Sequence, residues 1–97
     1  MSIKSAKKRK EQIKYDGMDI DYTFSLWVVP RLEWLKHNTI SHPTELTMDE
    51  WKDILQDMID GFHWYSIDKH SGINDIDHER VELALSLFKK WFYDLWD

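Results

Sequence analysis

Between residues 46 and 62 the chain repeats apolar side chains at steps of three and four residues. The repeat comprises Trp51, Ile54, Leu55, Met58, Ile59 and Phe62. This spacing puts the side chains on one face of an α-helix, while the acidic and basic residues between them fall on the opposite, solvated face. Thr47 and Glu50 have the spacing of a capping box, and Leu46 with Trp51 suits a hydrophobic staple. The pattern therefore predicts a buried helix that begins at Thr47.

A second helical repeat runs to the end of the chain. It comprises Val81, Ala84 or Leu85, Phe88, Trp91 or Phe92, and Leu95. We expect this helix to start near Asp75 or Asp77, after a loop over residues 66–74. Gly61 weakens the preceding helix, which could continue for one more turn beyond it. Because chain ends fray unless they are held, Trp96 beside the terminal Asp97 indicates an end docked on the core or on a partner.

A third apolar segment covers residues 18–37, where Phe24, Trp27 or Val28, Leu32 and Leu35 fall on one helical face. Pro30 lacks an amide donor and clashes with the preceding turn, so we expect a kink near residues 26–29. A helix that begins only at Pro30 is the alternative. Three amphipathic helices with short connections predict an all-α fold, a small three-helix bundle formed by one domain over residues 18–97.

Residues 1–17 lack an apolar repeat and end at the turn signal Asp16-Gly17, which predicts a mobile basic arm with transient helix around residues 6–14. The segment 1–14 carries six bases and one acid, or +5. The rest of the chain carries the other seven bases and seventeen acids, or −10, which together give the net charge of −5. The arm could fold back on its own acidic body, or could contact nucleic-acid phosphates through Lys7, Lys8, Arg9 and Lys10.

Composition argues against a conventional active site. The chain has no cysteine and three glycines, so it offers no disulfide, no thiolate metal site and no Gly-rich phosphate loop. No apolar run reaches the roughly 18–20 residues that span a bilayer, which favours a soluble, cytoplasmic protein without membrane contact. Acid–base chemistry by Asp57, Asp60 and His63 would need desolvated carboxylates, whereas these residues fall on the solvated face.

Two metal-site patterns also fail. Asp68 and Glu79 have the separation of the first and last ligands of a calcium loop, but the intervening oxygen ligands and the sixth-position glycine are missing. His63, His70 and His78 lack zinc-motif spacing. We therefore predict no metal, no cofactor and no catalytic residues.

The six tryptophans exceed what so small a core easily encloses, since tryptophan is rarely buried completely. Trp and Tyr are enriched in interfaces, so some rings are predicted to contact a partner, with nearby acids providing electrostatic steering. The predicted contact residues are Trp27, Trp34, Trp64 and Trp91, with Asp53, Asp57 and Asp60 as the acidic flank. Homo-oligomerisation and partial burial within the monomer would explain the excess equally well.

The segments LTMDEWKDILQDMIDGFHW (46–64) and ERVELALSLFKKWFYDLWD (79–97) resemble a family of small, largely uncharacterised proteins of tailed bacteriophages. The similarity extends to YTFSLWVVPRLEWLK (22–36), so that it spans about three quarters of the chain, from residue 22 to residue 97. Its specific parts are Thr47, Glu50-Trp51, Ile54-Leu55, Met58-Ile59 and Leu95-Trp96-Asp97. The resemblance implies expression in the cytoplasm of an infected host bacterium, and it transfers no catalytic residues.

Together these features predict a non-enzymatic phage accessory protein that binds a host or phage protein, for instance to modulate a host protein or host defence. The main alternative is a nucleic-acid-associated factor that uses the basic arm. A small metal-dependent enzyme and an acidic DNA mimic are further alternatives, although the acids form no obvious phosphate-like rows.

Overall fold

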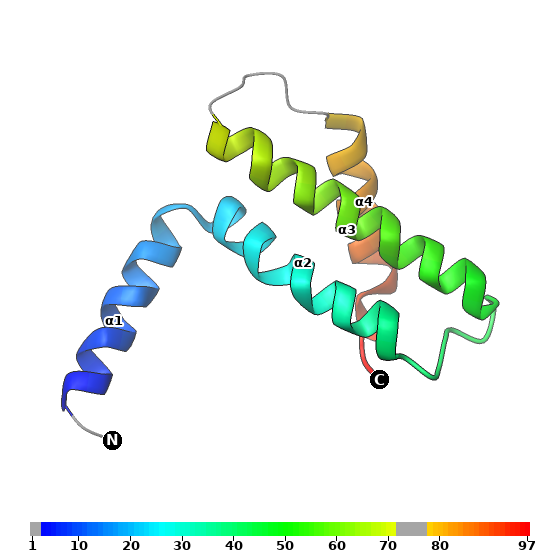
Figure 1. The fold of residues 1–97 in the computed structure, drawn as a ribbon, viewed down its shortest axis with the longest axis horizontal. Coiled ribbons are helices and arrows are strands. Elements are labelled where there is room, and N and C mark those ends of the chain that lie inside the picture. Colours follow the sequence, from blue (N-terminus) through cyan, green and yellow to red (C-terminus); the bar gives the residue numbers. More distant parts are fainter. Residues whose placement is uncertain (1–2, 72–77) are drawn as a thin grey trace.

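The computed structural model describes the backbone of residues 3–71 and 78–97, and the side chains of residues 6–67 and 78–97. Every regular element in these residues is helical: α1 (Ile3–Met18), α2 (Ile20–Asn38), α3 (Met48–Ser71), α4 (His78–Trp91) and a 3-10 turn, η1 (Phe92–Asp94) (Figure 1). The predicted all-α class is confirmed. The predicted number of three helices is wrong, because α1 is a fourth helix.

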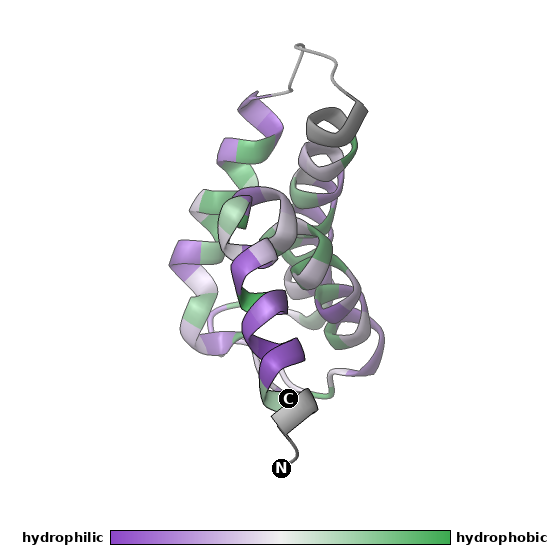
Figure 2. Ribbon diagram, turned by 90° about the vertical axis from the view of Figure 1, so that its left-hand side faces the viewer, coloured by the Kyte–Doolittle hydropathy of each residue, from purple (hydrophilic) through white to green (hydrophobic). Residues whose placement is uncertain are grey.

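The segment that we expected to be an arm forms α1. Half of its residues are lysine, arginine, glutamine or glutamate, all of which favour helix even where no apolar repeat exists. Figure 1 shows α1 standing away from the other helices, and the colouring of Figure 2 shows that most of its residues are hydrophilic. The radius of gyration of 15.8 Å exceeds the roughly 12.5 Å expected for a compact chain of this length, because α1 projects.

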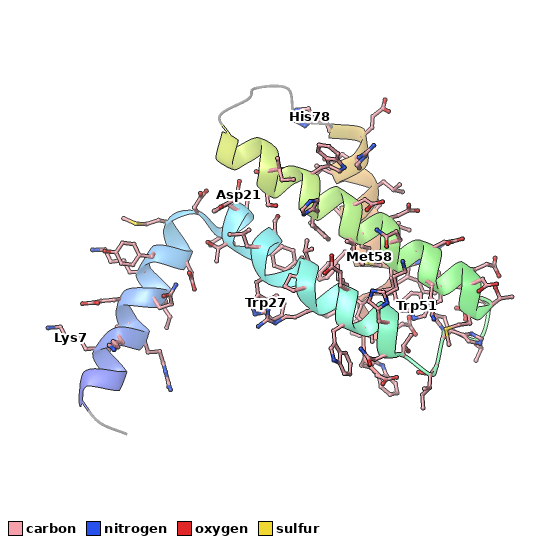
Figure 3. All side chains as sticks on the ribbon, viewed as in Figure 1. Lys7, Asp21, Trp27, Trp51, Met58 and His78 are labelled. Carbon is pink, nitrogen blue, oxygen red and sulfur yellow. The ribbon has the colours of Figure 1, made fainter. Side chains whose placement is uncertain are left out.

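α3 is the central helix of the bundle, and both α2 and α4 pack against it. All members of the predicted α3 stripe are buried except Ile54, which is half-buried. Three phenylalanines, one from each bundle helix, meet edge to face: Phe24 lies 5.4 Å from Phe62 and 5.6 Å from Phe88 between ring centroids. This contact joins α2, α3 and α4 into one core, in which Figure 3 shows Trp51 and Met58.

α2 runs without interruption from Ile20 through Pro30 to Asn38, so the alternative start at Pro30 is wrong. Pro30 is exposed, and its neighbours Val28 and Leu32 are buried against α3. The core contacts on both sides of the proline hold the helix together despite the missing amide donor.

α3 extends to Ser71, so the loop predicted from residue 66 is also wrong up to that position. Gly61 lies inside the helix where α3 crosses α4. A Cβ atom there would collide with the Cβ of Ala84 and would lie 2.6 Å from the carbonyl oxygen of Arg80. The glycine therefore marks a close helix crossing, and α3 continues beyond it. The predicted start of α4 at Asp75 or Asp77 lies outside the described residues.

The predicted capping box of α3 is confirmed. The amide of Glu50 donates to Thr47 Oγ1 at 3.2 Å, and the amide of Thr47 donates to Glu50 Oε1 at 2.9 Å. Leu46 packs against the core cluster that contains Trp51, as a hydrophobic staple requires. The hydrogen bonds from the Thr47 backbone and side chain hold the pKa of the Glu50 carboxyl below its ordinary value.

Replacing Thr47 with alanine is expected to cost about 1 kcal/mol of unfolding free energy, because an N-cap acceptor is lost. The pKa of Glu50 should also rise, but only in part, because the backbone amide of Thr47, the larger cause of the low pKa, remains in the variant. The pKa of Glu50 is lower in the folded protein than in the unfolded chain, so the ionised carboxylate stabilises the fold at pH values above its pKa in the unfolded chain. This contribution is lost as the pH falls through the pKa of Glu50 in the folded protein. Denaturant unfolding and an NMR titration of Glu50 test both effects. An unchanged free energy of unfolding in the variant would contradict the cap.

Among the helices that the structure describes, none combines the length and apolar character required to cross a membrane.

Candidate interaction site

Three side chains on one flank of α2 form the first wall of a surface groove. Trp27, Arg31 and Trp34 are separated by four and three residues, so they project from the same side of the helix. The Arg31 guanidinium lies 4.4 Å from the centre of the Trp27 ring and also donates a hydrogen bond to the Trp27 carbonyl at 2.9 Å. These two contacts fix the Arg31 side chain along the wall of the groove.

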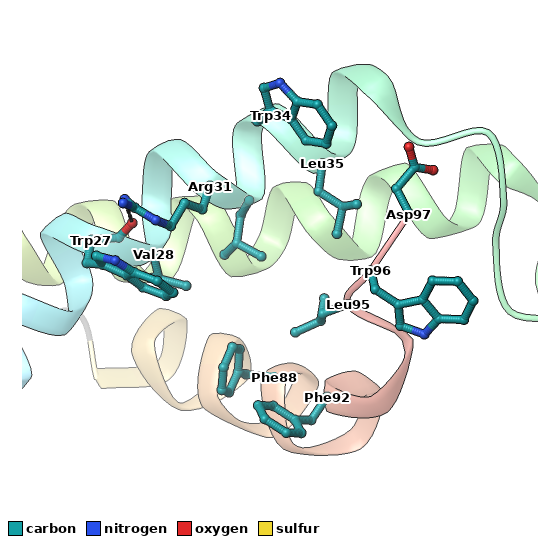
Figure 4. Close-up of a pocket in the computed structure, with 11 residues that line it drawn as sticks. Trp27, Val28, Arg31, Trp34, Leu35, Phe88, Phe92, Leu95, Trp96 and Asp97 are labelled. Atoms are coloured by element: carbon teal, nitrogen blue, oxygen red, sulfur yellow. Dashed lines mark hydrogen bonds between the residues drawn. The ribbon is translucent and has the colours of Figure 1, made fainter.

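The C-terminal segment forms the opposite wall. After α4, the η1 turn and the last three residues bring Phe92, Leu95 and Trp96 beside α2 (Figure 4). The Trp96 indole N–H donates to the Tyr93 carbonyl at 3.0 Å, so the outward ring has no unmet donor. Asp97 accepts a hydrogen bond from the Ile40 amide at 3.1 Å, which ties the chain end to the connection after α2.

We call this site the aromatic groove. It has a volume of about 370 Å³, and apolar side chains line most of it. Its lining residues are Trp27, Val28, Arg31, Leu32, Trp34, Leu35, Phe88, Phe92, Leu95, Trp96 and Asp97. Trp27, Trp34, Phe92 and Trp96 are 53%, 59%, 54% and 69% exposed. Large exposed apolar surfaces of this kind are characteristic of binding sites.

Compared with known protein families, with curated proteins and with solved structures, the chain matches none. The resemblance to phage proteins therefore stays a prediction, and the site has to be interpreted from its own geometry.

The structure divides the predicted contact residues among four places, the last of which is the core. Trp27 and Trp34 line the aromatic groove. Trp64, Asp57 and Asp60 line a different depression between α3 and α4, which we call the α3–α4 hollow. Asp53 is exposed on α3, one turn before Asp57. These three predicted acidic residues therefore lie outside the aromatic groove.

Trp91 requires a correction, because its side chain is buried in the core and is only 7% exposed. Its ring packs edge to face against Trp51, with the ring centroids 5.9 Å apart. The buried Trp91 Nε1 has no hydrogen-bond partner among the residues that the structure describes. Trp91 therefore contributes to folding and is unavailable as the surface contact that we predicted.

The sequence reasoning did not place Arg31, Phe92 or Trp96 in the site. Phe92 follows Phe88 by four residues, and the two rings lie 5.5 Å apart between centroids, so helical spacing was an available signal for this pair. The sequence predicts a docked chain end at Trp96. In the structure Leu95 packs against the core, while the Trp96 ring remains exposed.

The α3–α4 hollow lacks the burial that acid–base catalysis requires. Asp57 and His63 are exposed, and half-buried Asp60 accepts a hydrogen bond from the Gln56 amide at 2.7 Å. Among the described residues, no three histidine, aspartate or glutamate side chains are placed so that they could hold a metal ion. The calcium-loop positions from Asp68 to Ile73 lie outside the described side chains. The aromatic groove is therefore the principal candidate site.

Proposed function

We propose that this protein acts without catalysis, by binding another protein in the aromatic groove. The supporting observation is convergence: four large aromatic side chains from α2 and from the C-terminal segment line one continuous groove, and each is more than half exposed. Aromatic side chains at the centre of an interface often provide most of the binding free energy, because they fill partner pockets and exclude water.

The groove has features of a preorganised site. Core residues Val28, Leu32 and Leu35 form part of its lining and are held against α3, so partner binding requires little reordering there. The Arg31 guanidinium is positioned along one wall, where it could receive a partner carboxylate. A partner segment with apolar side chains and an acidic group would complement this arrangement.

The proposed setting rests on the phage resemblance. In that setting the protein is a phage accessory factor in the host cytoplasm, and the groove engages a host or phage protein whose activity it modulates.

Removing groove rings is expected to weaken partner binding. Replacing both Trp34 and Trp96 with alanine removes two central contacts, and loss of about 2 kcal/mol at each would weaken binding roughly 1,000-fold if the losses add. Capture of partners from host cells by the tagged full chain, with quantitative mass spectrometry, identifies a partner that the wild type enriches. Titration of that purified partner then gives the dissociation constants.

Trp64→Ala is the matched control, because it removes an exposed indole that lies outside the groove. It should leave binding unchanged within about threefold, a difference below about 1 kcal/mol. Equal losses in the Trp64 variant and the groove variant would contradict the proposal, and so would a wild-type chain that enriches no protein.

A nucleic-acid role is the second candidate, and the geometry of α1 favours it. Lys7, Lys8, Arg9 and Lys10 are all exposed on a helix that stands off the acidic bundle, and Figure 3 shows Lys7 pointing away from it. Binding carried by these cations should weaken steeply as salt rises and should vanish when residues 1–14 are removed. Binding to a short DNA duplex that survives either change would reject this role.

A further inference from the structure

α1 lacks a packing partner along most of its length. Its contacts with the rest of the described chain are confined to the neighbouring α2. Ile13, Tyr15 and Met18 are 64%, 67% and 71% exposed. A lone helix as short as α1 is only marginally stable in water, and helices in proteins depend on packing for most of their stability. A surface that covers α1 would therefore stabilise it.

One exposed face of α1 is predominantly basic, with three lysines against Glu11 and with apolar side chains beside them. Lys7, Lys10 and Lys14 follow one another at steps of three and four residues, so they form a row along the helix. Ile13 lies three residues after Lys10, beside this row. The occupant that α1 requires is thus an acidic surface with apolar side chains at its centre.

The same chain carries such a surface on its bundle. The α3–α4 hollow has a volume of about 520 Å³, and Asp57, Asp60 and Glu79 line it around the half-exposed side chains of Trp64 and Leu83. The guanidinium of Arg80 lies 5.3 Å from the centre of the Trp64 ring. Three acids against one base leave the hollow negative.

α1 cannot reach the α3–α4 hollow of its own chain while the fold is kept. Only Asp19 separates the end of α1 from the start of α2. Every lining residue of the hollow belongs to α3 or α4, and Figure 1 shows α1 extending away from both helices. A second copy of the chain can supply the helix without any change of fold.

We propose that two copies associate reciprocally, with α1 of each copy docked in the α3–α4 hollow of the other. Lys7, Lys10 and Lys14 face the hollow's acids, and Ile13 packs toward Trp64 and Leu83. The exchange is self-complementary, as a two-fold dimer requires, and it creates two contact regions at once. None of these contact residues lines the aromatic groove, so the exchange goes beyond the binding role proposed above.

Sedimentation equilibrium of the full chain tests the association directly. We expect twice the monomer mass of 11.8 kDa at low salt. Because exposed charges are screened, raising NaCl from 50 to 500 mM should weaken association by about tenfold or more. Lys10→Glu should weaken it further than the matched control Lys8→Glu, which changes the charge equally on the other side of α1.

A charge exchange makes the test specific to these two surfaces. Lys7→Glu/Lys10→Glu/Lys14→Glu and Asp57→Lys/Asp60→Lys/Glu79→Lys should each reduce self-association by about 100-fold, since like charges then face one another. Mixed together, the two variants should form a heterodimer, because both contacts then join opposite charges: the acidic helix of the first variant meets the basic hollow of the second, and the native basic helix of the second meets the native acidic hollow of the first. Circular dichroism confirms that both variants remain helical.

A monomer at every concentration up to about 1 mM, where even weak association becomes visible, would overturn the proposal. A dimer that neither triple variant weakens would also overturn it, as would variants that fail to pair when mixed. A chain that stays monomeric yet binds a short DNA duplex through residues 1–14 would overturn it in favour of the nucleic-acid role. None of these results depends on Trp34 or Trp96, so failure here leaves the groove proposal standing.

Discussion

Replacing Trp51 with alanine is expected to lower the free energy of unfolding by about 3–5 kcal/mol. Trp51 is 1% exposed, lies in the first turns of α3 and packs edge to face on Trp91. The substitution removes a whole indole from a core of three helices, and the cavity that remains cannot close easily. Small domains have only about 5–15 kcal/mol of stability, so the variant should be close to unfolding at moderate temperature.

Trp34→Ala is the matched control, because it removes the same indole from the wall of the aromatic groove, where 59% of it is exposed. Its unfolding free energy should change by less than about 1 kcal/mol. Urea titrations of both variants, followed by circular dichroism at 222 nm, give the comparison. Similar losses in the two variants would show that the core and the groove are assigned incorrectly.

The sequence could predict the position of some tryptophans and not of others. Trp51 belongs to a regular apolar repeat behind a capping box, and both local signals identified its buried position. Trp91 also fits a helical repeat, but Phe92 fits equally well, and only the placement of α4 against α3 decides which ring enters the core. Composition indicated an excess of rings without assigning each ring to a side of its helix.

The sequence could not predict which residues form the aromatic groove, and the reason is different. One wall belongs to α2 and the other to the end of the chain, with the whole of α3 between them in the sequence. The second wall also depends on the turn after Trp91 that brings Trp96 back beside α2. α1 was missed because it has no apolar repeat, although its residues favour helix. Periodicity therefore predicted the helices that are held by the core, and it could predict neither a helix without a core nor a site assembled by a chain reversal.

Replacing Gly61 with alanine is expected to destabilise the protein by about 1–3 kcal/mol, which is the usual cost of overpacking. Helix propensity alone gives the opposite sign, because alanine is favoured over glycine inside a helix by about 1 kcal/mol. The crossing of α3 with α4 decides the outcome: the new methyl group would overlap the Ala84 Cβ and approach the Arg80 carbonyl oxygen to 2.6 Å. Relieving the overlap requires α4 to shift, and the Phe24–Phe62–Phe88 contact would loosen with it.

Gly17→Ala provides the matched control, since an added Cβ there meets no atom within 4 Å. The same substitution should therefore leave stability unchanged or raise it by up to about 1 kcal/mol, by helix propensity alone. The midpoint of thermal unfolding should therefore fall for Gly61→Ala, and it should rise or stay unchanged for Gly17→Ala.

Adding Ala84→Gly to Gly61→Ala removes the overlap between the two methyl groups but leaves the close approach to the Arg80 carbonyl. The double variant should therefore recover only part of the lost stability. Full recovery would mean that α4 moves freely along α3, and an unchanged Gly61→Ala variant would mean that the two helices do not meet at this glycine.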